Sequence, residues 1–293
     1  MLVIVGYLII LFSVFGGFAM AGGHLYALLQ PIELLMIGGA ALGAFVAANN
    51  AKTIKTTFKA VFSTITSFHY SKTFYVQLLS LLYELVNKIK RDGVLSIEAD
   101  IENYRESAIF SIYPLIQKED QIMEFLCDYL RLIITGRVDV HQLENLMEQD
   151  IETFECEKEQ PIHAINKVSD ALPAFGIVAA VMGVVHTMGS VGIPPEELGE
   201  RIAQAMVGTF LGVLLSYGFT APLAALLEHK MKATLKILNA IEVVLLATVN
   251  QFAPTIAVEF GRKVIYSTDR PNGKELEDII KDIKIKKSGP QNE

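Results

Sequence analysis

The sequence has few cysteines and none of the common short motifs of soluble enzymes. Cys127 and Cys156 are its two cysteines, and both lie in polar stretches. Two thiols are too few for a disulfide framework and are typical of a reducing compartment, so we expect ordinary helix residues. Phosphate-binding glycine loops, HExxH and GxSxG are all absent. We therefore expect no enzymatic activity, no catalytic residue, no metal site and no cofactor.

Clustered positive charge is also missing. The chain carries a net charge of -7, whereas a nucleic-acid-binding protein needs a concentrated basic surface, so we expect no nucleic-acid partner. Charge is absent from long windows and dense between them, in a chain that is 52% hydrophobic. This uneven pattern predicts membrane spans that alternate with solvated segments.

Four windows are apolar over the roughly 20 residues that a helix needs to cross a bilayer. They cover about residues 2–21, 31–50, 171–192 and 202–227. The first window ends in Ala19-Met20-Ala21, which resembles a signal-peptide cleavage site. Because it is too long for a signal peptide and no Lys or Arg precedes it, we expect a retained helix. The only acid in the windows is Glu33, near one end of the second, where we expect it to reach the membrane interface.

Lysine and arginine are distributed unequally between the two sides of these spans. The links over residues 22–30 and 193–200 contain neither residue type. Lys52, Lys55 and Lys59 follow the second span, Lys167 precedes the third, and Lys230 and Lys232 follow the fourth. Since positive charge marks the cytoplasmic side, we expect both termini in the cytoplasm. The predicted parts are two spans (1–50), a cytoplasmic helical domain (51–170), two further spans (171–227) and a cytoplasmic extension (228–293).

The cytoplasmic segments have helical periodicity. Apolar residues recur at helical spacing over 72–91, 122–133 and 143–154, which predicts a compact helical bundle. The fourth span should continue as a long helix toward Phe252 and break near Pro254. An amphipathic piece should cover 274–285, followed by a disordered tail after Lys287. The predicted fold class is all-α, a polytopic membrane protein with four transmembrane helices and a cytoplasmic helical bundle.

The third and fourth windows contain no Asp, Glu, Lys or Arg. A protein that moves protons or cations unaided normally has an ionisable side chain at membrane depth. The polar candidates here are His186, Thr187, Thr209, Ser216 and Tyr217. Hydroxyl groups line a path or coordinate a cation, but they do not hold a proton near neutral pH. His186 either relays protons or, more commonly, bonds to a neighbouring helix. If ions cross, the carboxylate should therefore come from a partner helix.

Three further patterns each leave two interpretations open. Small residues repeat four apart at Gly39, Gly43 and Ala47, at Gly176 and Ala180, and at Gly208, Gly212, Ser216 and Thr220. These stripes favour close packing either within the chain or between subunits. Pro173 and Pro222 lie near the cytoplasmic edge of the predicted spans. They are either prolines of the kind that membrane spans tolerate or a hinge that passes motion from the membrane to the bundle. The residues of mixed charge from Glu84 to Asp100 form either a solvated face or a docking surface for a charged partner.

Four segments together resemble the MotA family, the larger stator subunits of the bacterial flagellar motor. They are LPAFGIVAAVMGVVHTMGS at 172–190, AMVGTFLGVLLSYGF at 205–219, VEFGRKVIYS at 258–267 and DIENYRES at 100–107. The resemblance runs from Met1 to about Pro271. It implies an inner-membrane subunit that couples ion flow to rotation. It also implies a pentamer around two MotB chains, with MotB supplying the proton-binding Asp and the rotor protein FliG receiving the force.

The resemblance also implies roles for particular residues. Pro173 and Pro222 match the family's proline pair at the ion path, and Thr209 matches a hydroxyl that lines it. Tyr217 is a further candidate on the same span. Ala180 stands where sodium-driven relatives tend to carry a hydroxyl, which favours protons as the coupling ion.

The cytoplasmic part has its own implied site. Glu98 matches an acidic residue that contacts FliG, and Lys90 or Arg91 matches its basic counterpart. Lys90 stands where the family usually has Arg, which keeps the charge but loses bidentate geometry.

Two rival functions remain. An ExbB- or TolQ-like subunit would use the same channel principle to energise outer-membrane processes. A self-contained ion transporter would conduct without any partner.

Overall fold

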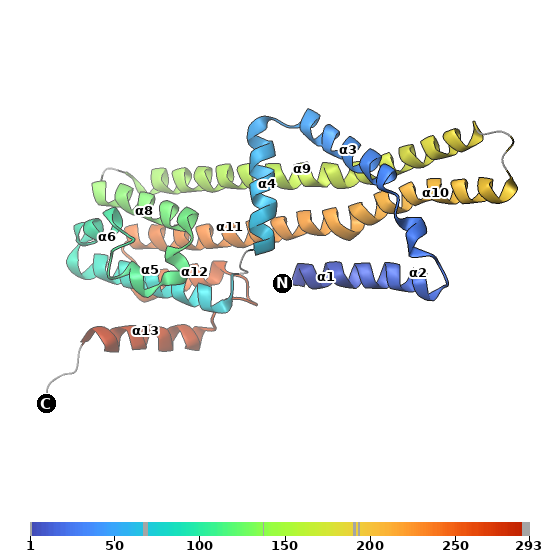
Figure 1. Ribbon diagram of the computed structural model, residues 1–293. Helices are drawn as coiled ribbons and strands as arrows, with labels where there is room; N and C mark the ends of the chain where they lie inside the picture. Colours follow the sequence, from blue (N-terminus) through green and yellow to red (C-terminus); the bar gives the residue numbers. More distant parts are fainter. Residues whose placement is uncertain (1, 67–69, 137, 190–191, 193, 289–293) are drawn as a thin grey trace. The chain divides into compact units, whose positions relative to one another are not determined.

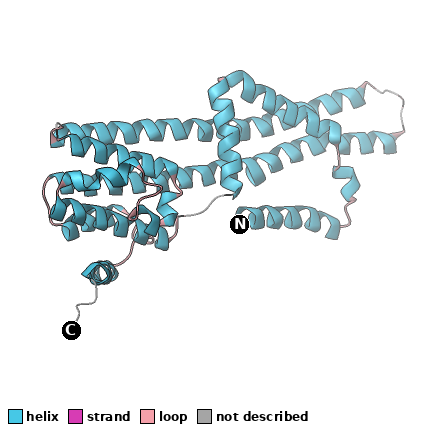
Figure 2. Cartoon of the chain, turned by 60° about the vertical axis from the view of Figure 1, so that its left-hand side comes forward, coloured by secondary structure: helices cyan, strands magenta, loops and turns pink. Residues whose placement is uncertain are grey.

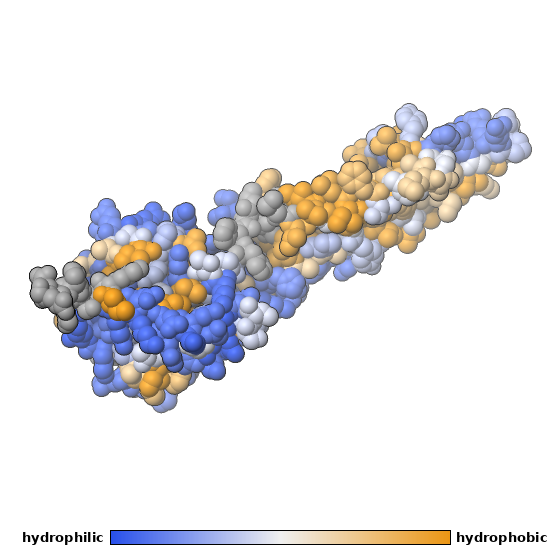
Figure 3. Space-filling model, turned by 90° about the horizontal axis from the view of Figure 1, so that it is seen from below, coloured by the Kyte–Doolittle hydropathy of each residue, from blue (hydrophilic) through white to orange (hydrophobic). Residues whose placement is uncertain are grey.

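The computed structural model describes residues 2–66, 70–136, 138–189, 192 and 194–288, and all regular structure in these ranges is helical (Figures 1 and 2). The chain forms two compact units. We call the first, Met1–Phe68 with Glu157–Lys230, the membrane unit, and the second, His69–Cys156 with Met231–Glu293, the polar unit. In the face shown in Figure 3, apolar residues gather along the middle of the membrane unit, and hydrophilic residues cover most of the polar unit.

The four predicted membrane spans are confirmed as long apolar helices. The first is formed by α1 (Leu2–Leu11), a π-helical turn η1 (Phe12–Gly16) and α2 (Gly17–Met20). The second comprises a 3-10 turn η2 (Leu25–Leu28) and α3 (Pro31–Ala48). Pro31 is suited to the first turn of α3 because it lacks the N–H that would be unsatisfied there.

The third and fourth spans belong to much longer helices. α9 runs from Val140 to Met188, so the apolar pattern predicted at 143–154 and the third span are one continuous helix. The fourth span comprises α10 (Pro195–Val213), a π-helical turn η5 (Leu214–Thr220) and the start of α11 (Ala221–Val249). As predicted, the chain breaks after α11 and restarts as a helix at Pro254.

A helix absent from the sequence-based expectations follows the second span. Asn50 caps α4 (Ala51–Thr66) from the position before it, because its Oδ1 accepts the backbone N–H of Thr53 at 2.8 Å. Thr53 and Thr57 are buried, and Thr53 Oγ1 lies 3.3 Å from Gln160 Oε1 on α9. The lysines of this segment therefore lie on a helix that packs against α9.

The polar unit is the predicted helical bundle. Its elements are α5 (Lys72–Asp92), η3 (Val94–Ile97), α6 (Glu98–Glu102), η4 (Phe110–Ile112), α7 (Pro114–Gln117), α8 (Asp120–Thr135), the ends of α9 and α11, α12 (Pro254–Val264) and α13 (Gly273–Ser288). α5 is its central helix, because Leu78, Leu81 and Tyr83 are each buried although they point in different directions around the axis. α13 packs against α5 through buried Leu276 and the Lys72–Glu275 ion pair of 2.8 Å.

The predicted helices at 72–91, 122–133 and 274–285 are confirmed by α5, α8 and α13. Ser288 ends α13, and the rest of the tail predicted to be disordered lies outside the described residues. The four-part division into spans and cytoplasmic segments stays a prediction.

Candidate functional site: an uncharged helix pair and a charged corner

Small residues bring α9 and α10 into backbone contact. A Cβ added at Gly176 would lie 2.8 Å from the carbonyl oxygen of Gly208, and one added at Gly212 would lie 2.6 Å from that of Leu172. Real Cβ atoms essentially never approach so closely, so only glycine fits at either position. Of the two interpretations of the small-residue stripes, packing within the chain is therefore confirmed for these two helices.

A polar pair extends this contact toward Pro222. Ser216 Oγ donates to the Ser169 carbonyl at 2.6 Å, and the two hydroxyl oxygens lie 3.0 Å apart. Ser216 is 1% exposed. Its role is therefore helix packing, and the structure removes it from the candidates that face an ion path.

The π-helical turn η5 lies immediately before Pro222. In a regular α-helix the proline ring would meet the carbonyl of Gly218, four residues earlier. The wider turn relieves this conflict, and Thr220 Oγ1 donates to the Leu215 carbonyl, five residues back, at 2.9 Å. Such turns inside α-helices are frequent at functional sites. Pro173, by contrast, lies within the continuous helix α9.

Two of the remaining ion-path candidates, Thr209 and Tyr217, lie on the open side of the helix pair. Thr209 is exposed, and Tyr217, eight residues further on, is 67% exposed on the same side. Ala180, Pro173 and Pro222 are half-buried. The structure thus leaves one hydroxyl-bearing face of the fourth span uncovered by the described part of the chain.

The two other polar candidates of the third span, Thr187 and His186, differ in exposure. Thr187 is buried, and its hydroxyl donates to the carbonyl of Gly183 at 2.8 Å within α9. This self-contained bond makes Thr187 a poor candidate for an ion path. His186 is exposed one residue earlier.

Glu33 is not where the sequence suggested. Its side chain was expected to reach the membrane interface, but it is 8% exposed and turns into the seam between α9 and α10. A Cβ at Gly208 would collide with its Oε2, and one at Gly183 would lie 3.5 Å from its Oε1. Oε2 has no hydrogen-bond partner among the described residues. The signal was available in the sequence, since an acid inside an apolar window is costly unless it has a role.

The charged stretch from Glu84 to Asp100 separates into two groups. Glu84 is buried and accepts a 2.7 Å hydrogen bond from Tyr113, whose pKa is raised by burial. Lys88 and Asp100 form a half-buried ion pair of 2.7 Å, and Ser107 donates to the same carboxylate. Glu84, Lys88 and Asp100 therefore hold α5, α6 and the following loop together. For these three residues, both predicted interpretations, a solvated face and a docking surface, are wrong.

The second group is exposed at the turn around Gly93. Lys90 and Arg91 lie in the last turn of α5, Gly93 has a φ of 87°, and Glu98 begins α6. A φ of this sign is readily adopted only by glycine. We call Lys90, Arg91 and Glu98 the charged corner; all three are exposed. Glu98 forms no ion pair within the described ranges of the chain.

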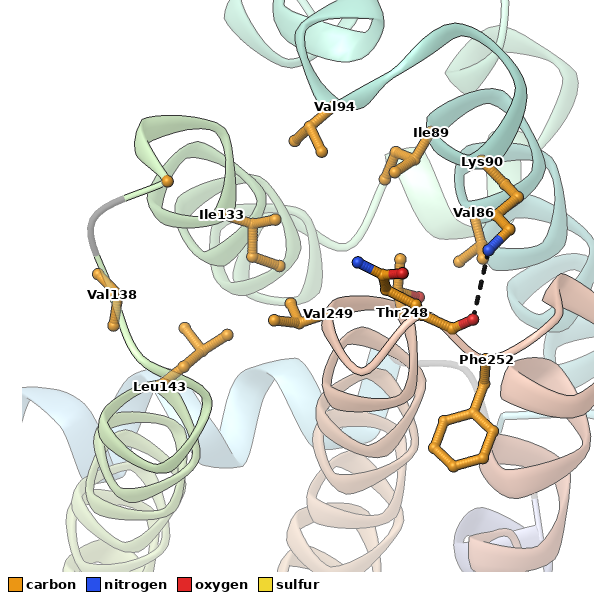
Figure 4. Close-up of a pocket in the computed structure, with 12 residues that line it drawn as sticks. Val86, Ile89, Lys90, Val94, Ile133, Val138, Leu143, Thr248, Val249 and Phe252 are labelled. Carbon is orange, nitrogen blue, oxygen red and sulfur yellow. Dashed lines mark hydrogen bonds between the residues drawn. The ribbon is translucent and has the colours of Figure 1, made fainter.

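Arg91 and Lys90 differ in what they bind. Arg91 makes two hydrogen bonds to the neighbouring Asp92, at 2.8 Å and 2.7 Å. These bonds hold the pKa of the Asp92 carboxyl below its usual range. Lys90 Nζ instead donates to the backbone carbonyl of Gln251 at 3.3 Å, so its charge has a neutral partner (Figure 4).

The Gln251 carbonyl is available because of the way α11 ends. Phe252 N–H bonds to the Ala247 carbonyl at 3.0 Å and Gln251 N–H to that of Thr248 at 2.9 Å, the Schellman arrangement. Gln251 has a φ of 62°, at a position where glycine is usual. Sequence reasoning missed this residue because no glycine marks the helix end.

An apolar cavity lies beside this bond. It has a volume of about 370 Å³ and is bounded by the ends of α5, α8 and α11 and the start of α9. Lys90 enters it from one side, opposite Ile133 and Leu143 (Figure 4). The lysine stem thus packs against apolar surface while its ammonium group meets a helix C-terminus, which favours positive charge.

Together, the fold and the uncharged helix pair define a membrane-embedded subunit of the ion-channel type. Residues 117–240 match the MotA/TolQ/ExbB proton channel family, and residues 4–93 match the motility protein A N-terminal family. The chain is 50% identical over 284 residues to motility protein A of Salmonella typhimurium, covering 97% of this chain and 96% of that protein. The chain therefore belongs to the motility protein A family.

Two solved structures share the fold. The C. jejuni MotAB structure has a TM-score of 0.78 at 17% identity, covering 90% of this chain and 95% of that one. The flagellar MotAB stator complex from Bacillus subtilis has a TM-score of 0.73 at 22% identity, covering 87% and 92%.

Proposed function

We propose that this chain is a flagellar stator subunit that works with MotB to convert ion flow across the inner membrane into torque on the rotor. One observation carries the proposal. The third and fourth spans are uncharged, close against each other at Gly176 and Gly212, and leave a hydroxyl-bearing face exposed. A titratable group supplied by another chain, the Asp of MotB, completes a path along that face.

The proposed assembly is a pentamer of this subunit around two MotB chains. Gly39 and Gly43 on α3 support close packing of copies, because no atom of the described residues lies within 4 Å of a Cβ added at either position. The interpretation of small residues as subunit contacts thus remains open for α3, although it fails for the α9–α10 seam.

The proposed topology has four spans in the inner membrane with both termini in the cytoplasm. Its support is the distribution of lysines, which follow the second and fourth spans and avoid the links after the first and third. Exposed apolar side chains such as Leu35 (73%) and Val185 (66%) fit lipid or a neighbouring subunit.

The proposed coupling ion is the proton. Ala180 offers no side-chain oxygen, and Thr209 is a single hydroxyl that cannot surround a dehydrated cation by itself. Binding of each proton to the partner Asp would change the preferred packing of the helices through differential contacts. Pro173 and Pro222 would allow this change, Pro222 through the π-helical turn before it.

The proposed rotor contact is the charged corner, facing FliG. Lys90 and Glu98 present opposite charges on either side of the Gly93 turn. Exposed complementary charges steer and register an encounter more than they strengthen it, which suits a contact that must form and break repeatedly.

A complementation assay tests the proposal. A deletion strain carrying wild-type protein should swim equally with and without sodium, whereas Pro173→Ala and Glu98→Lys should both impair swimming. Glu196→Gln, an exposed acid at the other end of the spans, is the matched control and should swim normally. Intact swimming of the deletion strain with impaired outer-membrane uptake would instead indicate an ExbB- or TolQ-like role.

A further inference from the structure

Glu33 is a buried acid with an unsatisfied oxygen in a chain whose other spans are uncharged. It lies in the first turn of α3, and its side chain is 8% exposed. Oε2 has no hydrogen-bond partner among the residues that the structure describes. An ionised carboxylate without partners is strongly disfavoured in a membrane, so such a group either holds a proton or receives one readily.

Its surroundings are shaped to receive the carboxyl group. Gly208 leaves the space that Oε2 occupies, since a Cβ there would collide with this oxygen. Gly183 and Ala205 form the adjoining wall, where a Cβ added at Gly183 would lie 2.7 Å from the Ala205 Cβ and 3.5 Å from Glu33 Oε1. The carboxyl group therefore touches both helices of the proposed path, next to the turn that carries Thr209.

We propose that Glu33 is a second proton-binding carboxylate of the path, contributed by this chain at the outer end of the third and fourth spans. This inference rests on the proposed function. Glu33 takes a proton from hydronium on the outer side, leaving water, and becomes a neutral carboxylic acid. It then releases the same proton toward the partner's carboxylate and regains its charge, so protons and charge balance at every turn of the cycle.

Among the described residues, no neighbouring charged group is a hydrogen-bond partner of Glu33 Oε2. The titratable groups toward the outer ends of the elements packed on α3 are His186 of α9 and Glu196, Glu197, Glu200 and Arg201 of α10, with His24 and Tyr26 in the preceding link. Arg201, the one guanidinium in this set, bonds to Glu197 at 2.7 Å. A proton is thus the occupant that the pocket favours over a salt-bridge partner.

A purely structural role makes a different prediction. An acid in the first turn of a helix also stabilises the positive end of the helix dipole. Glutamine is nearly isosteric with glutamate and would retain the packing while losing the titration. Glu33→Gln and the conservative Glu33→Asp therefore separate the two roles.

The first experiment is infrared spectroscopy of the complex with MotB in lipid. At neutral pH the wild type should show a carboxylic-acid C=O stretch that Glu33→Gln removes, whereas Glu196→Gln leaves it unchanged. Identical wild-type and Glu33→Gln spectra would overturn the inference. This readout is independent of torque and of ion flow.

The second experiment is proton flux through the same complex in liposomes. We expect Glu33→Gln to lower the flux about a hundred-fold, the usual order for losing one proton-transfer group, and Glu33→Asp to restore part of it. If the Glu33→Gln complex conducted protons as fast as the wild-type complex, the inference about Glu33 would be contradicted and the proposed function would stand. Absence of flux in the wild-type complex would instead contradict the proposed function, so the two failures are distinguishable.

Discussion

Gly212 faces Gly176 across the seam between α9 and α10, so closely that a Cβ added at Gly212 would lie 3.0 Å from the Gly176 Cα and 2.6 Å from the Leu172 carbonyl oxygen. We expect Gly212→Ala to force the helices apart at a cost of about 1–3 kcal/mol. Thermal unfolding of the wild type and the variant in detergent measures this loss of stability. Gly6→Ala, where no atom in the part of the chain that the structure describes lies within 4 Å of the added Cβ, is the control and should not destabilise the protein.

Lys90 and Arg91 are adjacent basic residues, but we expect Lys90 to matter more for torque. Arg91 is bonded to Asp92 through both carboxylate oxygens, whereas the Lys90 ammonium group donates to a neutral carbonyl. Exposed ion pairs contribute about 0.2–1 kcal/mol each, so we expect partial loss of torque from Lys90→Glu and a smaller loss from Arg91→Glu.

Torque on single tethered cells distinguishes the two substitutions. Arg131→Glu on α8, an exposed arginine bonded to Asp128, serves as the control for net charge. A larger defect from Arg91→Glu than from Lys90→Glu would show that Arg91 is the rotor-facing base.

Gln251 adopts a φ of 62°, which costs a residue with a side chain about 1–2 kcal/mol relative to glycine. We expect Gln251→Gly to raise the free energy of unfolding by about 1 kcal/mol, because glycine adopts this conformation freely. Gln251→Ala should give no such gain. The bond from Lys90 uses the backbone carbonyl and should persist in both variants.

The parts of the fold that could be predicted are those that local sequence patterns indicate. Apolar periodicity located α5, α8 and α13, and hydropathy located the four spans. Gly208 and Gly212 signalled close helix contact because residues four apart share a helix face. Each of these signals depends only on neighbours in sequence.

The errors came from features that depend on distant contacts. Glu84 was assigned to a polar face of α5, but helices pack around the whole of α5 and bury it. The apolar residues Leu78, Leu81 and Tyr83 point to three different sides of the helix and could have indicated this. The orientation of Glu33 depends on how α3 rotates against α9 and α10, which no local pattern determines. The conformation of Gln251 follows from tertiary packing at the end of α11.

Acid should weaken one anchoring contact of the polar unit. Arg262 is 6% exposed and bonds to both carboxylate oxygens of Glu259 at 2.6 Å and 2.7 Å, and to the Pro271 carbonyl at 3.1 Å. The bonds to Arg262 hold the pKa of Glu259 below its usual range. A lowered folded-state pKa contributes stability that is complete above the ordinary glutamate pKa and is lost as pH falls through the folded-state value.

We therefore expect Glu259→Gln to lower the melting temperature at neutral pH and to differ less from wild type as pH falls below the ordinary glutamate range. Circular dichroism at a series of pH values measures the difference. A constant difference between the two proteins at every pH would contradict this account of the contact.

Proton flux into liposomes, measured for the chain alone and for the chain with MotB, tests most directly whether the titrating group of the inner path belongs to a partner. The uncharged third and fourth spans predict that the chain alone conducts no protons, that the complex does, and that replacing the Asp of the MotB span by Asn abolishes the flux. Proton flux through liposomes containing this chain and no second polypeptide would contradict the account.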